Sequence, residues 1–124
     1  MADRDPLTEA IIGAALRVRH NVGVGLLESA YHAFVVHELG KLDLIVLSRP
    51  SLPAIYDGIA IKVAYRPDLI VNNRVIVELK TVTTILPVHK AQLLTYMRLS
   101  RIKTGLIINF FAVPFTDGLV RMVL

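Results

Sequence analysis

Residues 67–80 have the sequence PDLIVNNRVIVELK, in which two apolar runs flank the polar tripeptide Asn72-Asn73-Arg74. Short runs rich in β-branched residues on either side of such a turn predict a β-hairpin. We expect its strands over residues 68–71 and 75–80. Each strand carries an acidic side chain in an otherwise apolar setting, so the pairing of the two strands decides whether these acids meet.

The length of the turn sets the register of this hairpin. A three-residue loop pairs Ile70 with Ile76 and places Asp68 opposite Glu78, with both carboxylates on one face of the sheet. Asparagine tolerates the left-handed backbone conformation that such loops use near their ends. A two-residue loop would turn Asp68 to the other face unless a bulge corrected it. We therefore predict the odd loop length or an equivalent bulge.

The end of the second strand carries residues whose side chains suggest a role in catalysis. Side chains alternate along a strand, so Glu78 and Lys80 share one face and Leu79 points to the other. Two carboxylates, Asp68 and Glu78, can hold a hard divalent cation such as Mg²⁺ through their oxygens. The lysine beside them can position or deprotonate an attacking water, or stabilise negative charge on a phosphate.

In the rest of the chain, the spacing of apolar residues and the turn residues predict two helices, an antiparallel meander, a third helix and further strands. No repeat, low-complexity tract or linker interrupts it, so we expect one domain over residues 1–124 with an α/β fold, a central mixed sheet flanked by helices. The expected elements are a helix from Asp5 to a break at 21–25, a helix over 26–39 with Gly40 as its C-cap, a strand at 44–47, a hairpin of 52–56 and 59–65, a helix over 87–100, and strands at 106–110 and 119–124.

The composition excludes several classes of protein. An apolar share of 54% with 19% charged residues is too hydrophobic for a disordered chain. The absence of cysteine excludes disulfides, thiolate metal sites and a cysteine nucleophile. The longest apolar stretch, residues 104–116, is shorter than the about 20 residues of a membrane-spanning helix. The first residues lack the apolar core of a signal peptide, so we expect a soluble, cytoplasmic protein without membrane contact.

Basic residues gather in the second half of the chain. The formal net charge is +4, and no acidic residue occurs between Glu78 and Asp117. An ordinary solvated face and a surface that contacts nucleic-acid phosphates both fit this pattern, and the sequence leaves the two open. The cations that would make such a surface, besides Lys80, are Lys90, Arg98, Arg101 and Lys103.

Three short patterns resemble those of a known enzyme superfamily. Pro67-Asp68, nine residues and Glu78-Leu79-Lys80 resemble the signature of the PD-(D/E)XK nucleases. The segment GLLESAY at 25–31 is similar to the pattern that names the GxxExxY family, and QLLTY at 92–96 resembles the QxxxY element of the RecB-like and lambda-exonuclease-like branch. The resemblance extends from about Leu7 to Phe110 and implies a restriction-endonuclease-like core.

The resemblance also implies roles for individual residues. Asp68 and Glu78 would bind the metal ion together with the backbone carbonyl of Leu79, and Lys80 would be the catalytic lysine. Glu28, in the second helix, would reach the metal directly or through water. Each residue also has a structural interpretation: an acid at a helix start is favourable with the helix dipole whatever its function.

A glutamine and a tyrosine on the third helix complete the expected site. Gln92 and Tyr96 lie four residues apart on one helical face and would orient Lys80 or touch a substrate phosphate. His89 stands one turn before Gln92 and could face the same cleft. Tyr31 is expected to pack in the core with its hydroxyl anchored.

Two classes of function remain open from the sequence. The first is a nuclease that uses Mg²⁺, with Mn²⁺ as a substitute, to hydrolyse phosphodiester bonds, with DNA as the expected substrate. The second is a module with the nuclease fold that binds nucleic acid or a protein partner without catalysis. A purely structural homo-oligomer is a third interpretation of the apolar excess, and a homodimer is compatible with all three.

Overall fold

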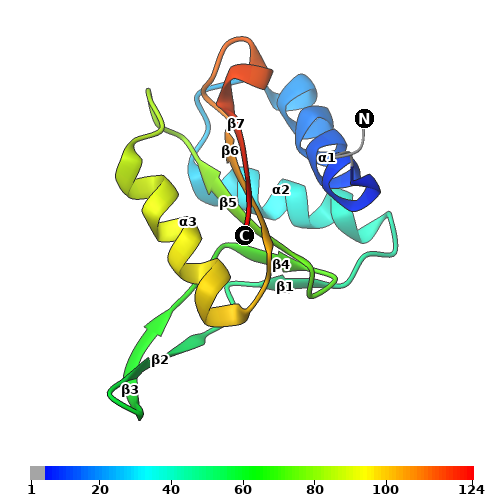
Figure 1. The fold of residues 1–124 in the computed structure, drawn as a ribbon. Helices are drawn as coiled ribbons and strands as arrows, with labels where there is room; N and C mark the ends of the chain where they lie inside the picture. Colours follow the sequence, from blue (N-terminus) through cyan, green and yellow to red (C-terminus); the bar gives the residue numbers. More distant parts are fainter. Residues whose placement is uncertain (1–4) are drawn as a thin grey trace.

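The computed structural model describes residues 5–124, apart from the side chains of residues 62–64. Within these described residues, three α-helices and seven strands follow one another in the order shown by the colours of Figure 1. They are α1 (Pro6–Val22), α2 (Glu28–Gly40), β1 (Val46–Ser48), β2 (Leu52–Tyr56), β3 (Ile59–Tyr65), β4 (Leu69–Val71), β5 (Val75–Lys80), α3 (Pro87–Ser100), β6 (Thr104–Asn109), the 3₁₀ turn η1 (Phe115–Gly118) and β7 (Leu119–Val123).

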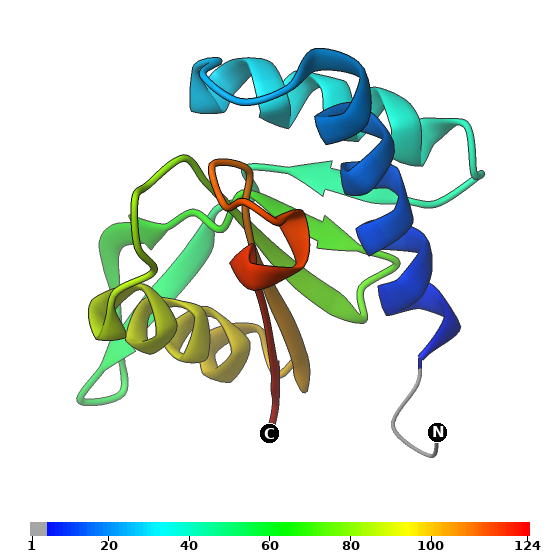
Figure 2. The same cartoon turned by 90° about the horizontal axis from the view of Figure 1, so that it is seen from above.

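Five of the strands form the central sheet, in the order β1-β4-β5-β6-β7. The strands β5 and β6 are parallel and the other neighbours are antiparallel, so the sheet is mixed. Helices α1 and α2 cover one face of the sheet and α3 covers the other (Figure 2). The predicted α/β fold with a helix-flanked mixed sheet, consistent with a restriction-endonuclease-like core, is confirmed.

The hairpin of β4 and β5 has the predicted register. Ile70 pairs with Ile76 and Val71 with Val75, which leaves a three-residue loop. Asn72 and Asn73 in this loop have positive φ angles of 51° and 53°, in the left-handed region that asparagine tolerates better than most residues. The odd loop length therefore places Asp68 opposite Glu78 across the hairpin.

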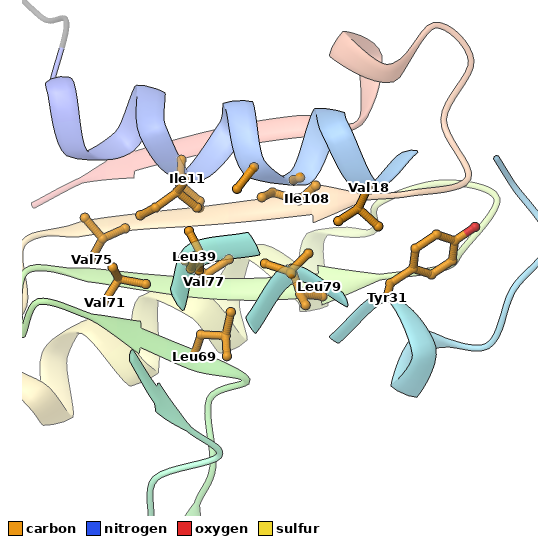
Figure 3. Packing of buried hydrophobic residues seen from close by; sticks show 14 of the residues in the cluster. Ile11, Val18, Tyr31, Leu39, Leu69, Val71, Val75, Val77, Leu79 and Ile108 are labelled. Atoms are coloured by element: carbon orange, nitrogen blue, oxygen red, sulfur yellow. The ribbon is translucent and has the colours of Figure 1, made fainter. Parts of the chain in front are cut away.

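The alternation of side chains along β5 separates the two cores. Val75, Val77 and Leu79 pack into the cluster beneath α1 and α2, which Figure 3 shows from close by. Ile76 packs into a second cluster with residues of α3. Glu78 has the same parity as Ile76, so its side chain belongs to the face that α3 covers.

Helix α3 lies unusually close to the sheet because β6 carries a glycine beneath it. A Cβ atom on Gly105 would lie 2.6 Å from Sδ of Met97 and 2.8 Å from Cδ1 of Leu93. The helix connects the parallel strands β5 and β6, so its first turn lies near the carboxyl ends of both. The segment that follows Lys80 therefore runs directly into the covering helix.

Several predicted boundaries were wrong. The second helix begins at Glu28 instead of residue 26 and includes Gly40, which is followed by Lys41 in the right-handed helical conformation. The first strand occupies 46–48 instead of 44–47. Local spacing alone does not fix such ends, because the first strand is defined by its pairing with β4.

The predicted meander was also wrong in its pairing. The strands β2 and β3 form a separate two-stranded sheet, and β1 pairs directly with β4. The chain thus leaves the central sheet after β1 and returns at β4, and the hairpin extends away from the sheet in Figure 1. Across the described residues, 5–124, no helix has the length and apolarity that crossing a membrane would require.

Candidate functional site

Two carboxyl groups lie close together at the end of the β4–β5 hairpin that is opposite its turn. Asp68 precedes the first residue of β4, and its Oδ2 accepts a hydrogen bond of 2.8 Å from the backbone N–H of Leu79. Glu78 is only 4% exposed, and the negative charge of Asp68 lies close enough to raise its pKa. The predicted convergence of the two acids on one side of the hairpin is therefore present.

Burial makes this pair costly to ionise. The pKa of Glu78 is raised to about 9, first by burial and then by the negative charge of Asp68, while Lys80 acts in the opposite direction. The Oε1 atom of Glu78 is buried without a hydrogen-bond partner. Buried polar atoms are seldom left unpaired in folded proteins. The carboxyl oxygens of Asp68 and Glu78 therefore lie close together, and a bound cation would give the unpaired Oε1 of Glu78 a partner.

Glu28 lies at the edge of the same site. It is the first residue of α2, and its pKa is raised by burial and then by the charge of Asp68, while Lys80 and Arg49 lower it. Within residues 5–124 no three Asp, Glu or His side chains are arranged to hold a metal ion. Both modes of metal contact considered for Glu28, direct and through water, stay predictions.

The position of Glu28 depends on a buried tyrosine one turn further along α2. The hydroxyl of Tyr31 donates a hydrogen bond of 2.6 Å to the carbonyl of Gly23 and accepts one of 3.4 Å from the N–H of Leu26. The Tyr31 ring stacks on that of Phe110, with centroids 4.4 Å apart. Tyr31 is thus a packing residue with an anchored hydroxyl, as predicted, and it fixes the turn that leads into α2.

Helix α3 contributes a second tyrosine on the opposite side of the site. Tyr96 is 5% exposed, and its pKa is raised by burial and by the charges of Glu78 and Asp68. The Gln92 side chain acts in the opposite direction and lowers the pKa of Tyr96. The structure therefore brings the predicted Gln92 and Tyr96 pair together and places Tyr96 near the carboxyl groups.

The ring of His89 has a structural task at the start of α3. Its Nδ1 accepts a hydrogen bond of 3.0 Å from the backbone N–H of Leu86, the residue that precedes the helix. The same ring lines an open groove of about 300 Å³ with Tyr65 and Gln92. Tyr65 lies edge-on to Tyr96, with ring centroids 6.2 Å apart. The contact of His89 with a substrate stays a prediction. In the structure its ring caps the start of α3.

The sequence analysis missed Asn109, which holds the segment after Lys80. Its Oδ1 accepts a hydrogen bond of 3.1 Å from the N–H of Val82, and its Nδ2 donates one of 2.8 Å to the carbonyl of the same residue. Asn109 is opposite Lys80 in the parallel register, and the N–H of Phe110 donates to the carbonyl of Lys80. A lone asparagine in an apolar strand was the available signal, since a buried amide needs partners.

The predicted basic residues are divided between two ends of α3. Lys90 lines an open pocket of about 450 Å³ together with Asn109 and the threonines at 83 and 84. Arg101 and Lys103 precede Thr104, which pairs with Val75 at the far end of β5. Val75 and Lys80 are five residue steps apart along β5, which corresponds to about 17 Å. Arg98 lies in the last turn of α3, so Lys90 is the one of these four predicted cations that lies in the first turn of the helix.

Comparison with known proteins gives one clear result. A sequence model of the PD-(D/E)XK nuclease superfamily matches residues 5–122. No curated protein and no solved structure matches the chain. The match covers the hairpin with its two carboxyl groups, Lys80, α2 and α3.

Proposed function

The chain belongs to the PD-(D/E)XK nuclease superfamily, whose members are generally nucleases, and we propose that it hydrolyses phosphodiester bonds in DNA with the aid of Mg²⁺ or Mn²⁺. One observation carries this proposal. The buried carboxyl pair of Asp68 and Glu78, with an unpartnered oxygen on Glu78, lies within electrostatic range of Lys80. A packed core gains nothing from two such acids, whereas a site for a cation requires them.

The donor set fits a hard cation. Asp68 and Glu78 supply carboxylate oxygens, the carbonyl of Leu79 supplies a third oxygen donor, and the sequence contains no cysteine that would favour a softer metal. When bound, the cation would offset the negative charge that develops on the phosphate under attack. The proton that Glu78 holds at neutral pH would leave as the cation binds, because metal ligation requires ionised carboxylates.

The remaining residues would position the substrate and water. We assign to the ammonium of Lys80 the task of holding the attacking water or a phosphate oxygen. Tyr96, supported by Gln92, closes the α3 side of the site, and its hydroxyl can orient Lys80 or touch the phosphate. Glu28 approaches from the opposite side and would reach the cation directly or through water.

Two features support finer assignments within the superfamily. Glu28 begins α2 and Tyr31 anchors the turn before it, so two of the three named positions of the GxxExxY pattern have a structural task, and we assign the chain to that family. Lys90 in its pocket beside Asn109 supplies a cation for the phosphate backbone, which would make binding salt-dependent.

Cleavage assays with matched variants test the proposal. Purified protein is incubated with DNA in Mg²⁺, Mn²⁺ or EDTA, and we expect cleavage only with a metal ion. Asp68→Asn and Lys80→Ala should each lower the rate by at least about a hundredfold. Asp43→Asn and Lys41→Ala make the same substitutions in the exposed loop after α2 and should cleave at the wild-type rate.

The outcomes separate the two functions. Equal cleavage by wild type, Asp68→Asn and Lys80→Ala would remove the assigned site. Metal and DNA binding by the wild type, without turnover of any DNA or RNA, would favour a non-catalytic binding module.

We also propose a homodimer, on the strength of the β2–β3 hairpin. Three apolar side chains near its tip are mostly exposed: Ile55, Tyr56 and Ile59. Exposed apolar groups in one place mark interaction surfaces. Light scattering of the wild type and of Ile55→Ser tests this independently of activity, and a monomeric wild type would contradict it.

A further inference from the structure

The residue that follows β1 is tied to the carboxyl pair through its backbone. The N–H of Arg49 donates a hydrogen bond of 2.9 Å to the carbonyl of Asp68. The preceding residue, Ser48, pairs with Leu69 in the register of β1 and β4, which lie side by side in Figure 1. Its hydroxyl also lies 2.7 Å from Nε2 of His32 in α2. Arg49 is thus held at a fixed point beside Asp68.

The backbone of Arg49 adopts a conformation that its residue type rarely occupies. Its φ angle is 50°, in the left-handed region that glycine, asparagine and aspartate favour. Pro50 follows directly, and a proline disfavours helical conformations in the residue before it. Such conformations cost free energy and persist where surrounding contacts enforce them, which is frequent at functional sites. The ties of Ser48 and Arg49 are the contacts that enforce this one.

The side chain of Arg49 is exposed and its charge reaches into the site. Burial raises the pKa of Glu28 and lowers that of His32, and the positive charge of Arg49 is a smaller, lowering contribution to both pKa values. Glu28 and His32 lie on the same side of α2. Within residues 5–124 its guanidinium forms no salt bridge. A cation held beside acidic groups without an ion pair remains available for an anion from outside the chain.

We propose that Arg49 binds a phosphate of the nucleic acid next to the phosphate that is attacked at Asp68 and Glu78. The inference rests on the proposed function and extends it, because it names a separate contact for a neighbouring phosphate. The planar guanidinium matches two phosphate oxygens at once, which an ammonium does not. Arg49 lies on the side of the site formed by α2 and β1, and Lys90 lies on the α3 side. The bound strand would therefore pass over the carboxyl pair from one cation to the other.

The test measures binding of a DNA duplex in EDTA, where no cleavage occurs, by fluorescence anisotropy over a series of KCl concentrations. Arg49→Asn removes the charge but keeps a residue that tolerates the left-handed backbone, so the loop is retained. Arg49→Lys restores the charge without the planar fork. The control is Arg74→Asn in the β4–β5 turn, because Arg74 is exposed and lies at the opposite end of β4.

The expected result is specific to a phosphate contact. Arg49→Asn should bind roughly tenfold more weakly, and the slope of log affinity against log salt should fall in magnitude by about 1. Arg49→Lys should keep the wild-type slope with part of the affinity, and Arg74→Asn should match the wild type in both. A merely structural role for Arg49 would lower thermal stability and leave the salt slope unchanged.

The outcomes keep this inference apart from the proposed function. Wild-type slope and affinity in Arg49→Asn would overturn the phosphate contact, even if the wild type cleaves DNA. Failure of the wild type to bind the duplex would overturn it as well. A reduced slope without cleavage in Mg²⁺ or Mn²⁺ would support the contact and contradict the nuclease assignment.

Discussion

The carboxyl pair predicts that replacement of Glu78 by glutamine stabilises the metal-free protein. Glutamine has nearly the same shape as glutamate, and its amide can donate to the carboxylate of Asp68, as a protonated acid can. It differs because it requires no proton at neutral pH. Glu78→Gln therefore removes the cost of the acid while keeping the packing of β5 against α3.

The size of the effect follows from the pKa of Glu78, which lies at about 9 in the folded chain and at its ordinary 4.5 in the unfolded one. Between these values the folded protein binds a proton that the unfolded chain has released, so the free energy of unfolding decreases as pH rises. One pH unit corresponds to about 1.4 kcal/mol. At pH about 7 the wild type has lost about 3 kcal/mol relative to pH about 4.5, and Glu78→Gln has not lost it.

The assay is thermal or urea unfolding in EDTA at several pH values from about 5 to about 9. For a chain of 124 residues, about 3 kcal/mol corresponds to a rise in Tm of about 10 °C at pH about 7. Glu38→Gln is the control, because Glu38 is paired at the surface with Arg17 and Lys41 and its pKa is lowered. A lowered pKa gives the opposite sign, so this variant should be slightly less stable than the wild type at neutral pH.

Addition of Mg²⁺ should narrow the difference in stability between the two proteins. A ligand that binds only the folded state at a hundred times its Kd stabilises that state by about 2.7 kcal/mol. The wild type should gain this amount at high pH, and Glu78→Gln should gain much less. Parallel pH profiles of wild type and Glu78→Gln in EDTA would refute the reasoning, since they would show that Glu78 is ionised without cost.

Two further predictions concern the support of the site. Gly105→Ala should lower the free energy of unfolding by about 1–3 kcal/mol, because its Cβ would overlap Met97. The control Gly40→Ala has open space in α2 and should raise the free energy of unfolding by about 0.5–1 kcal/mol. Urea unfolding measures both variants, and equal effects would contradict the close approach of α3. Asn109→Ala should lower kcat by at least about tenfold with little change in KM, because it releases the segment after Lys80. Single-turnover cleavage measures this rate. An unchanged rate would contradict the positioning role of Asn109.

Local rules were sufficient for the hairpin that carries the two acids. The turn Asn72-Asn73-Arg74 fixed the register of β4 and β5 because loop length and side-chain alternation involve only neighbouring residues. The same rules located α3 over 87–100 without error. They also located both strands of the 52–65 hairpin, but not its place in the fold, since nothing within that segment indicates whether it joins the central sheet or, as observed, stands apart from it.

The amino-acid sequence by itself determined the alternation of helices and strands, the facing of Asp68 and Glu78, and the motifs that place the chain in its superfamily. The tertiary structure alone decided that Glu78 is buried with an unpartnered oxygen, that Asn109 holds Val82, and that Arg49 lies beside Asp68. The physical reason is the range of the interactions. Turn geometry and periodicity depend on adjacent residues, whereas desolvation and the pairing of β1 with β4 depend on segments far apart in the chain, which meet only after the layers have packed.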